Sequence, residues 1–327
     1  MENLEIKIMS ELQGKNILVT GGAGLVGGHV VEKLLSLGAK VVVLDIVVKP
    51  KSYFEIQKLR EKSKLVIQDV RDLAKLKELI LAENISYIFH LAAQALVPLA
   101  YEDPVLTLDT NIMGTVNILE AARLIPTVKA VVVASSDKAY GKDCKDATEG
   151  QALAGDHPYD VSKSAADLIC MAYFKTYGVP VTVSRFGNIF GQGDLNFDRI
   201  IPGIMNTAIN GKVLEIRSDG SFKRDYVYVK DVVDGYICLA EQIDKAKGEA
   251  FNFSSGFNFS VLNLIDDISK IIGKKVEYKI VNNQKNEIPE QSLNFTKAEQ
   301  MLGWKSKYTF ADGVQETYRW YKQLLNL

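Results

Sequence analysis

The chain has 327 residues, a formal net charge of −1 and a composition typical of a soluble globular protein. This length allows one large core, or two domains that share an interface. A net charge so close to zero offers no global field for nucleic acid or an anionic membrane, so we expect neither as a partner. Cys144, Cys170 and Cys238 lie far apart without C-x-x-C spacing, which predicts neither a disulfide framework nor a metal site.

The N-terminal stretch from Met1 to Leu12 mixes charged and apolar residues and lacks the continuous apolar core of a secretory signal. No later segment reaches the roughly 18 apolar residues of a membrane-spanning helix. We therefore expect a cytoplasmic location.

Short apolar runs alternate with helical patterns in the N-terminal half. Asn16 to Thr20 leads through a glycine-rich turn into residues with helical spacing, and Lys40 to Asp45 is a second, valine-rich run. Runs that are apolar at successive positions are typical of parallel strands covered on both faces. The further strands that we predict are Leu65 to Gln68, Tyr87 to Leu91, Ala130 to Ser135 and Val181 to Arg185. With helical patterns between them, such as Pro104 to Arg123, this alternation predicts an α/β fold with a doubly wound, Rossmann-like parallel sheet.

Past Asn188 the alternation of strand and helix patterns changes. The segments Gly256 to Ser260 and Asn282 to Gln291 are polar and loop-like. We predict a smaller α/β substrate-binding domain built from excursions out of the sheet domain. The predicted ranges are 1–187 plus 229–256 for the dinucleotide-binding domain and 188–228 plus 257–327 for the smaller one. The closing amphipathic helix, Phe310 to Leu327, could pack on either.

A glycine turn follows the first strand. Gly21, Gly24 and Gly27 form G-x-x-G-x-x-G, which also contains Leu25 and Val26, directly between a strand and a helix. The missing side chains let the backbone approach a pyrophosphate at the positive end of the helix. The alternative is an ordinary tight turn, because such a motif alone is weak.

An acidic residue, Asp45, ends the second strand, 21 residues after Gly24. A carboxylate there can accept hydrogen bonds from the adenosine ribose and repels a 2′-phosphate, so we expect NAD rather than NADP. Residues after the next strands are further candidates for cofactor contact, although each could equally be a strand end or a packing residue. They are Asp69, Val70, Leu91, Ala92 and Ala93.

Two short segments carry candidate catalytic groups. Ser136, Asp137 and Lys138 follow a run of valines, and Tyr159 and Lys163 stand four residues apart. A Tyr and a Lys one helical turn apart project from the same face, where the ammonium can lower the pKa of the phenol from about 10 toward neutrality. Such a change takes about 4 kcal/mol of differential stabilisation, so we expect Lys163 to need help from a cationic cofactor ring.

With these features the chain resembles the extended short-chain dehydrogenase/reductase family over nearly its whole length. The matching segments are Thr20 to Gly27, His90 to Ala93, the pair Tyr159 and Lys163, and Arg224 to Val229. Within that family it looks most similar to the nucleotide-sugar 4,6-dehydratases, especially the CDP-glucose 4,6-dehydratase subgroup. This closer likeness rests on Ala92 to Val97, Ser136 to Lys138, His157 to Lys163 and Gly193 to Arg199.

The resemblance implies an NAD-dependent dehydratase that converts a nucleotide-linked hexose to the 4-keto-6-deoxy sugar. Tyr159 and Lys163 would also contact the cofactor; Tyr159 would take a proton from the sugar 4-hydroxyl, and Ser136 would orient that hydroxyl. The usual Asp-Glu pair that eliminates water is represented by Asp137 and Lys138. Lys138 can act as the base only if neutral; otherwise it stabilises the enolate and Asp137 does more of the proton transfer. A solvated ion pair is the plain alternative.

The resemblance also assigns residues to the substrate and implies a homodimer or a dimer of dimers. The second subunit would pack on the helices Pro104 to Arg123 and Tyr159 to Tyr177. The expected substrate is CDP-glucose-like, or a GDP-, UDP- or dTDP-linked glucose or N-acetylglucosamine. The substrate-binding residues would be Gln94, Asn188, Asn196, Arg199 and Arg224, the last four around the pyrophosphate.

Two other functions remain open at this point. A 4-epimerase or 4-dehydrogenase of the same family would oxidise the sugar without eliminating water. This alternative stays open because Lys138 stands where the dehydratases usually have Glu. A non-catalytic dinucleotide sensor on the same fold would need none of Ser136, Tyr159 and Lys163.

Overall fold

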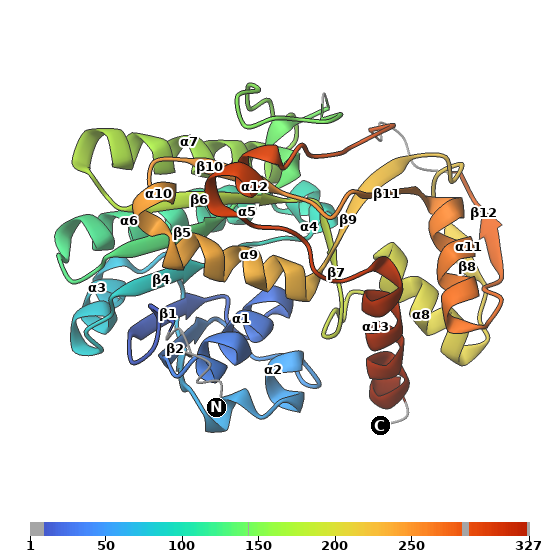
Figure 1. Ribbon diagram of the computed structural model, residues 1–327, viewed down its shortest axis with the longest axis horizontal. Helices are drawn as coiled ribbons and strands as arrows, with labels where there is room; N and C mark the ends of the chain where they lie inside the picture. The colour runs from blue at the N-terminus through green and yellow to red at the C-terminus, as the bar shows by residue number, and fades with distance from the viewer. Residues whose placement is uncertain (1–9, 143, 283–287, 326–327) are drawn as a thin grey trace, which may run out of the picture.

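The structure is a computed structural model that describes residues 10–142, 144–282 and 288–325. It consists of a large lobe, in which helices cover both faces of a central sheet, and a smaller lobe at one end (Figure 1). The paired strands β9 (Lys223–Tyr228) and β11 (Phe257–Ser260) extend from the large lobe into the smaller one. No helix in these ranges is long and apolar enough to cross a membrane.

The sheet of the large lobe has seven strands within the described residues, in the order β10-β6-β5-β4-β1-β2-β3. All neighbouring strands in it run parallel. The predicted doubly wound parallel sheet is thus confirmed. Its strands are β1 (Asn16–Thr20), β2 (Lys40–Asp45), β3 (Lys64–Ile67), β4 (Tyr87–His90), β5 (Ala130–Ala134), β6 (Val181–Phe186) and β10 (Ala250–Phe253).

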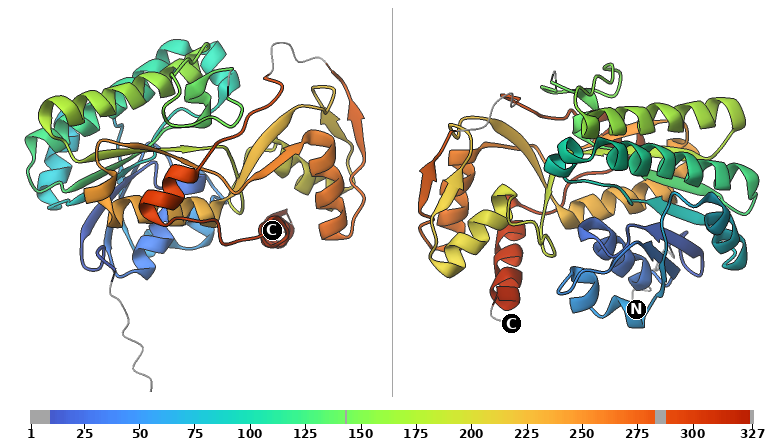
Figure 2. Two further views of the ribbon diagram at one scale, coloured as in Figure 1. Left: turned by 45° about the horizontal axis from the view of Figure 1, so that its top comes forward. Right: turned by 180° about the vertical axis from the view of Figure 1, so that it is seen from behind.

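Helices bury the two faces of this sheet in separate apolar cores (Figure 2). The first face carries α1 (Leu25–Ser36), α2 (Tyr53–Ile56), α9 (Val229–Glu241), α10 (Ile243–Ala246) and α12 (Thr296–Leu302). The second carries α3 (Leu73–Ala82), α6 (Gly114–Leu124) and α7 (Pro158–Tyr177). Valine-rich strands fit this arrangement because they present apolar side chains to both faces.

The direction of winding reverses beside β1, which lies between β2 and β4. The loops that follow β1 and β4 therefore meet at the carboxyl edge of the sheet. A Cβ on Gly21 would lie 2.7 Å from the backbone nitrogen of Ala92, so these loops are in direct contact. In open parallel sheets this reversal point is where ligands bind.

The smaller lobe is built from short strands and three helices around its own apolar core. In the described part of the chain its strands form two sheets, β11-β9-β7 and β12-β8. Its elements are β7 (Asn188–Phe190), α8 (Ile200–Asn210), β8 (Leu214–Ile216), β9 (Lys223–Tyr228), β11 (Phe257–Ser260), α11 (Val261–Ile272), β12 (Tyr278–Ile280) and α13 (Phe310–Leu325).

One predicted loop is wrong. Residues 257–260 form β11, which pairs antiparallel with β9, and Phe259 packs its ring 4.8 Å from that of Phe310. The alternation of aromatic and polar residues from Phe257 to Ser260 is the strand pattern that the polar composition concealed. Of the second predicted loop, Asn282 to Gln291, residues 283–287 lie outside the described residues, and Gln291 is fully buried.

The predicted helix from Pro104 to Arg123 is interrupted. The chain forms α4 (Val97–Glu102) and α5 (Pro104–Leu108), then a π-helical turn over Asp109–Met113, and then α6. Within that turn the Asn111 amide donates to the carbonyl of Gln94 (3.0 Å) and to Oγ of Ser162 (2.9 Å). These bonds give a physical reason for the irregular turn. The residue ranges of the two domains stay a prediction.

Candidate active site

The glycine turn after β1 leaves room only for backbone. Gly21 has φ +68°, and a Cβ on Gly27 would lie 2.1 Å from the carbonyl oxygen of Gly21. Gly24 is the N-cap of α1 and supplies no side-chain hydrogen bond to it. Because the first N–H groups of a helix have no partners within the helix, the amides that begin at Leu25 and Val26 fit an anion such as a pyrophosphate.

Asp45 lies directly against this turn. Its Oδ2 accepts a hydrogen bond from the backbone N–H of Ala23 (3.0 Å) and its Oδ1 accepts one from Ile46 (2.8 Å). Burial raises the pKa of Asp45, while these backbone hydrogen bonds oppose the rise. The carboxylate is therefore held beside the place where a ribose next to the pyrophosphate would lie.

The candidates after β3 and β4 have structural partners of their own. Asp69 forms an ion pair with Arg71 (2.7 Å), whose guanidinium lowers the pKa of that carboxyl. Val70 is buried against Gly114. The following loop, which contains Leu91 and Ala93, is fixed to β1 through Ala92, whose N–H donates to the Thr20 hydroxyl (3.3 Å). Arg71 donates hydrogen bonds to both carboxylate oxygens of Asp69. A contact between Asp69 and adenine stays a prediction.

A short 3₁₀ turn, η3 (Asp137–Tyr140), follows β5 and packs against α7. Its N-cap is Ser136, whose hydroxyl donates to Asp137 Oδ1 (3.0 Å) and accepts from the N–H of Lys138 (3.2 Å). The Asp137 side chain is buried by this turn. Serine at an N-cap thus holds the carboxylate in one orientation.

Helix α7 brings Tyr159 and Lys163 to the same place. Lys163 is buried, and its Nζ donates to the carbonyl of Ala134 at the end of β5 (2.8 Å). Its Nζ lies 6.0 Å from the centre of the Tyr159 ring, and the Ser136 hydroxyl is close enough to the phenol to lower its pKa. The structure therefore assembles Ser136, Asp137, Tyr159 and Lys163 into one cluster at the carboxyl edge of the sheet, in which Asp137 and Lys163 are buried and the other two are half-buried.

Without a bound cofactor, the electrostatics of this cluster do not favour the phenolate form of Tyr159. Burial and the negative charge of Asp137 raise the pKa of Tyr159, and the nearby Ser136 hydroxyl only partly opposes them. Burial lowers the pKa of Lys163 to about 8. An additional positive charge is needed to make Tyr159 a base near neutral pH, in line with the expectation that Lys163 needs help.

Lys138 contacts a residue that the sequence did not single out. Its Nζ donates a hydrogen bond to Oε1 of Gln291, which is fully buried. The two residues are separated by 153 positions, so no spacing in the sequence reveals the contact.

Two more buried acids surround the cluster and were also missed as site residues. Burial raises the pKa of Asp160 and of Asp225 to about 7, and the charge of Asp137 adds to both shifts. Asp160 Oδ1 lies 3.1 Å from Nε2 of His157. Asp225 stands in the segment Arg224 to Val229, so the only sequence signal for it was the family resemblance.

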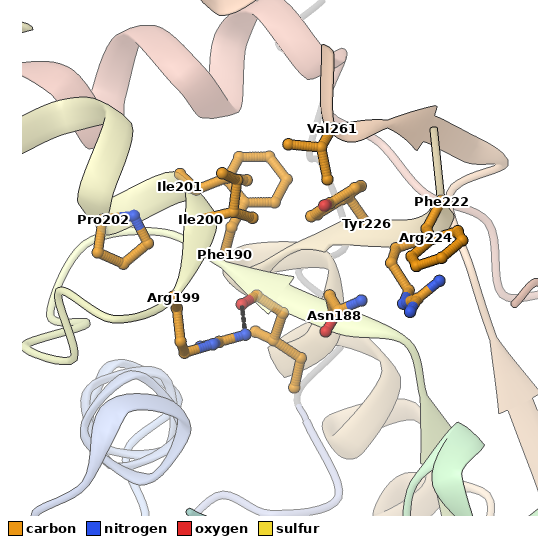
Figure 3. A pocket seen from close by; sticks show the side chains of 11 residues that line it. Asn188, Phe190, Arg199, Ile200, Ile201, Pro202, Phe222, Arg224, Tyr226 and Val261 are labelled. Carbon is orange, nitrogen blue, oxygen red and sulfur yellow. Dashed lines mark hydrogen bonds between the residues drawn. The ribbon is translucent and has the colours of Figure 1, made fainter. Parts of the chain in front are cut away.

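A cavity of about 190 Å³ opens in the smaller lobe (Figure 3). Three predicted substrate-binding residues, Asn188, Arg199 and Arg224, line it, and Figure 3 shows Asn188 between the two guanidinium groups. Arg199 is held by Asp194 (2.6 Å) and by the carbonyl of Ile189 (2.8 Å). The remaining lining is largely apolar and aromatic: Ile189, Phe190, Ile200, Ile201, Pro202, Phe222, Tyr226 and Val261.

The other two predicted substrate-binding residues have local partners. Asn196 is not among the residues that line this cavity, and its Oδ1 accepts from the N–H of Asp198 (3.1 Å). The Gln94 amide donates to the Thr107 hydroxyl (2.8 Å) and to the carbonyl of Leu96 (3.1 Å). Both side chains shape loops near the site. Across the described ranges no group of three or more His, Cys, Asp and Glu residues is placed to hold a metal ion.

Comparisons with known proteins agree with this architecture. The family model for GDP-mannose 4,6 dehydratase matches residues 18–317. The chain belongs to this family. As an extended short-chain dehydrogenase/reductase of the GDP-mannose 4,6 dehydratase family, it is an enzyme of a group that contains nucleotide-sugar dehydratases and epimerases.

Relatives of both kinds are similar to this member of the GDP-mannose 4,6 dehydratase family. CDP-glucose 4,6-dehydratase of Salmonella typhimurium is 32% identical over 95% of this chain and 91% of its own length. The structure of UDP-glucose 4-epimerase of Thermotoga maritima with UDP-glucose has a TM-score of 0.86 and 30% identity, covering 95% of this chain and 99% of its own. The dTDP-glucose 4,6-dehydratase of Streptomyces venezuelae, solved with NAD, also has a TM-score of 0.86, with 28% identity and coverage of 94% and 97%.

Proposed function

We propose that the protein is an NAD-dependent nucleotide-sugar 4,6-dehydratase. The observation that carries the proposal is the half-buried cluster in which Ser136 and Asp137, at the start of η3, meet Tyr159 and Lys163 on α7. An epimerase needs the phenol and the lysine to oxidise C4. An elimination requires an acid and a base in addition, and Asp137 and Lys138 on the same turn are the residues that would supply them.

NAD would bind at the carboxyl edge of the sheet, where the loops after β1 and β4 meet. The glycine turn would hold its pyrophosphate, Asp45 its ribose, and Lys163 and Tyr159 its nicotinamide ribose. Bound there, NAD would supply reversible hydride transfer, which the oxidation at C4 and the later reduction at C6 both need. Its positive ring also supplies the charge that lowers the pKa of Tyr159. NADP fits less well, because Asp45 would face the 2′-phosphate.

Proton transfers by the chain's own residues complete the reaction. Tyr159 takes the proton of the C4 hydroxyl, which Ser136 orients. The resulting ketone acidifies the hydrogen at C5. In this step Lys138 has to be the neutral amine and Asp137 has to carry a proton: Lys138 takes the C5 proton while the protonated Asp137 gives its proton to the departing C6 hydroxyl, which leaves as water. Lys138 then returns its proton to C5, and the proton gained by Tyr159 restores Asp137.

The substrate would be a nucleotide-linked glucose, held with its phosphates between Arg199 and Arg224. The likeness to CDP-glucose 4,6-dehydratase supports a CDP sugar. UDP-, GDP- and dTDP-linked glucose and N-acetylglucosamine are the other candidates. A thermal-shift screen against these sugar nucleotides, with NAD present, would identify the base, because a ligand that binds the native state raises its melting temperature.

Mass analysis of the products tests the proposal. A dehydratase gives a product lighter by one water. An epimerase leaves the mass of the sugar unchanged, and a 4-dehydrogenase removes two hydrogens. Failure to turn over any of these sugar nucleotides with NAD would favour a sensor. An unchanged mass, a loss of two hydrogens or an absence of turnover each contradicts the proposal.

A further inference from the structure

The contact between Lys138 and Gln291 joins the catalytic turn to the smaller lobe. The Gln291 backbone is fixed to that lobe, because its N–H donates to the carbonyl of Lys223 (3.1 Å) and its carbonyl accepts from the Asn258 amide (2.9 Å). The neighbouring Ser292 donates its N–H to the carbonyl of Cys144 (2.7 Å). Gln291 is therefore held firmly from both sides, and its amide reaches Lys138 from a fixed position.

Packing does not explain an amide at this position. Gln291 is 0% exposed, and its Nε2 has no hydrogen-bond partner among the described residues. Burying an unsatisfied donor costs free energy, whereas an apolar side chain of similar shape would fill the same space without that cost. Only Oε1 has a partner, and this partner is Nζ of Lys138.

The proposed reaction requires Lys138 to change its protonation state twice in each cycle. It takes the C5 proton as an amine and returns it as an ammonium. A carboxylate partner would stabilise the ammonium and disfavour the amine. An amide is neutral and has both an acceptor and a donor, so its Oε1 can accept from the ammonium and, after rotation of the amide, its Nε2 can donate to the amine.

We propose that Gln291 is a positioning residue for Lys138, which holds Nζ in the active site in both protonation states without adding a charge. This inference rests on the proposed dehydratase function, since only the elimination needs Lys138 to exchange a proton. The inference explains why the fully buried position 291 carries an amide, although its Nε2 has no hydrogen-bond partner among the described residues.

Other charged and titratable groups face Lys138 from the elements around it. Asp137 is its neighbour on η3, His157 and Asp160 come from the start of α7, and Cys144 comes from the loop after η3. The Glu290 carboxylate beside Gln291 pairs instead with Lys145 (3.2 Å). A neutral partner leaves this balance of charges unchanged, which a glutamate at position 291 would not do.

Two substitutions test the role of Gln291, each measured on the full chain with NAD. Gln291→Met keeps the volume and removes both polar atoms, and Gln291→Glu replaces the amide with a charge. Ser292→Ala is the matched control, because its hydroxyl accepts from the N–H of Asp146 (2.8 Å) on the same segment without contacting Lys138. Thermal melting reports folding, and NMR of the lysine side chains, with the Lys138 signal assigned through Lys138→Gln, reports the pKa of Lys138.

We expect Gln291→Met to melt at or above the temperature of the parent protein, yet to release water about 100-fold more slowly while C4 oxidation changes little. We expect Gln291→Glu to raise the pKa of Lys138 by about one unit or more, because a carboxylate stabilises the ammonium. The pH at which the rate of elimination increases should then be higher than in the parent protein. Ser292→Ala should leave the rate of elimination and the pKa of Lys138 unchanged.

Unchanged elimination in Gln291→Met, or the same pKa of Lys138 in the parent protein and Gln291→Glu, overturns the inference. If the parent protein releases no water from any sugar nucleotide, the proposed function fails instead. The pKa comparison then still decides whether Gln291 and Lys138 are in contact.

Discussion

Tyr159 is placed to act as the base, but its surroundings disfavour the phenolate that a base requires. Desolvation and the neighbouring carboxylate of Asp137 raise the pKa of its phenol, and burial lowers the pKa of Lys163 to about 8. A base in such surroundings becomes active only when a cation arrives. The site is thus expected to be inert toward sugars until NAD is bound.

Substitution of Tyr159 by Phe removes the base and leaves the glycine turn intact. We expect turnover to fall by about 10²–10⁴-fold or more, while calorimetry still shows NAD binding, because the glycine turn, Asp45 and Lys163 remain. Tyr177→Phe is the matched control, because Tyr177 is an exposed tyrosine at the far end of the same helix. Undiminished turnover in Tyr159→Phe would remove this residue from the mechanism.

Asp225 predicts how stability depends on pH. Burial raises its pKa to about 7, so between about pH 4 and pH 7 the folded protein keeps a proton that the unfolded chain has lost. Stability should therefore fall as the pH rises through this window. In Asp225→Asn, which can keep accepting from the N–H of Leu293, this part of the fall should be absent. Melting curves of both proteins from pH 4 to pH 8 provide the check, and a constant difference between them contradicts the assignment.

At the scale of elements, a buried ion pair fastens the catalytic turn to the sheet. Arg185 on β6 binds Asp167 on α7 through two hydrogen bonds (2.7 and 2.9 Å), and its Nη1 donates to the hydroxyl of Tyr140 on η3 (2.6 Å). The Tyr140 hydroxyl in turn donates to Asn252 on β10 (2.8 Å). Four elements thus meet behind the catalytic cluster.

Breaking this pair should be costly. Arg185→Met leaves the Asp167 carboxylate buried without a partner, and we expect a loss of about 3–5 kcal/mol in the free energy of unfolding. Adding Asp167→Leu should recover much of this loss, because no unpaired charge remains. Urea denaturation of the single and double variants gives both values. A loss below about 1 kcal/mol in Arg185→Met would show that the pair is not buried in solution.

The elements of the large sheet were readable from sequence because their signal is local. Valine-rich runs such as Lys40 to Asp45 and the glycine turn with its following helix each lie within a single segment. The strand β10 was not expected, since it has only four residues and contains Asn252, whose buried amide binds the carbonyls of Ala147 and Asn294.

The candidate site was predictable only where its residues share one motif. Ser136 to Lys138 and the pair Tyr159 and Lys163 stand close in sequence, and the structure brings them together. Gln291 and Asp225 enter the site through the pairing of distant short strands and loops. Their burial is a tertiary property, so a polar composition suggested a solvated loop around Gln291.

At the scale of the whole molecule, a polar network joins the two lobes. Glu316 on α13 accepts hydrogen bonds from the Tyr228 hydroxyl (2.7 Å) and from Nζ of Lys230 (2.6 Å). Its third partner, Gln192, also accepts through its carbonyl a hydrogen bond from His29 on α1 (2.9 Å). This network fixes the smaller lobe, which carries Arg199 and Arg224, relative to the sheet.

The outer face of α6 and α7 is where we expect a second copy of the chain to bind. The two helices lie side by side on the surface of the large lobe (Figure 2). Large apolar residues are exposed on and around them, among them Leu168 at 59% and Val105 at 74%. An exposed apolar stripe of this kind is typical of an interface between identical subunits.

Leu168→Glu tests this interface. A charge at its centre should weaken self-association by at least about tenfold, measured by analytical ultracentrifugation. Leu81→Glu on α3, at an equally exposed leucine (60%), is the matched control and should have no effect. A parent protein that sediments as a monomer at all concentrations would contradict the predicted homodimer.

The most direct test of the whole account follows one hydrogen through the reaction. The protein is incubated with NAD and with the sugar nucleotide that gives the largest thermal shift, carrying deuterium at C4. The account predicts a product that has lost one water and carries the deuterium at C6. Deuterium that remains at or returns to C4, in a product of unchanged sugar mass, would contradict it.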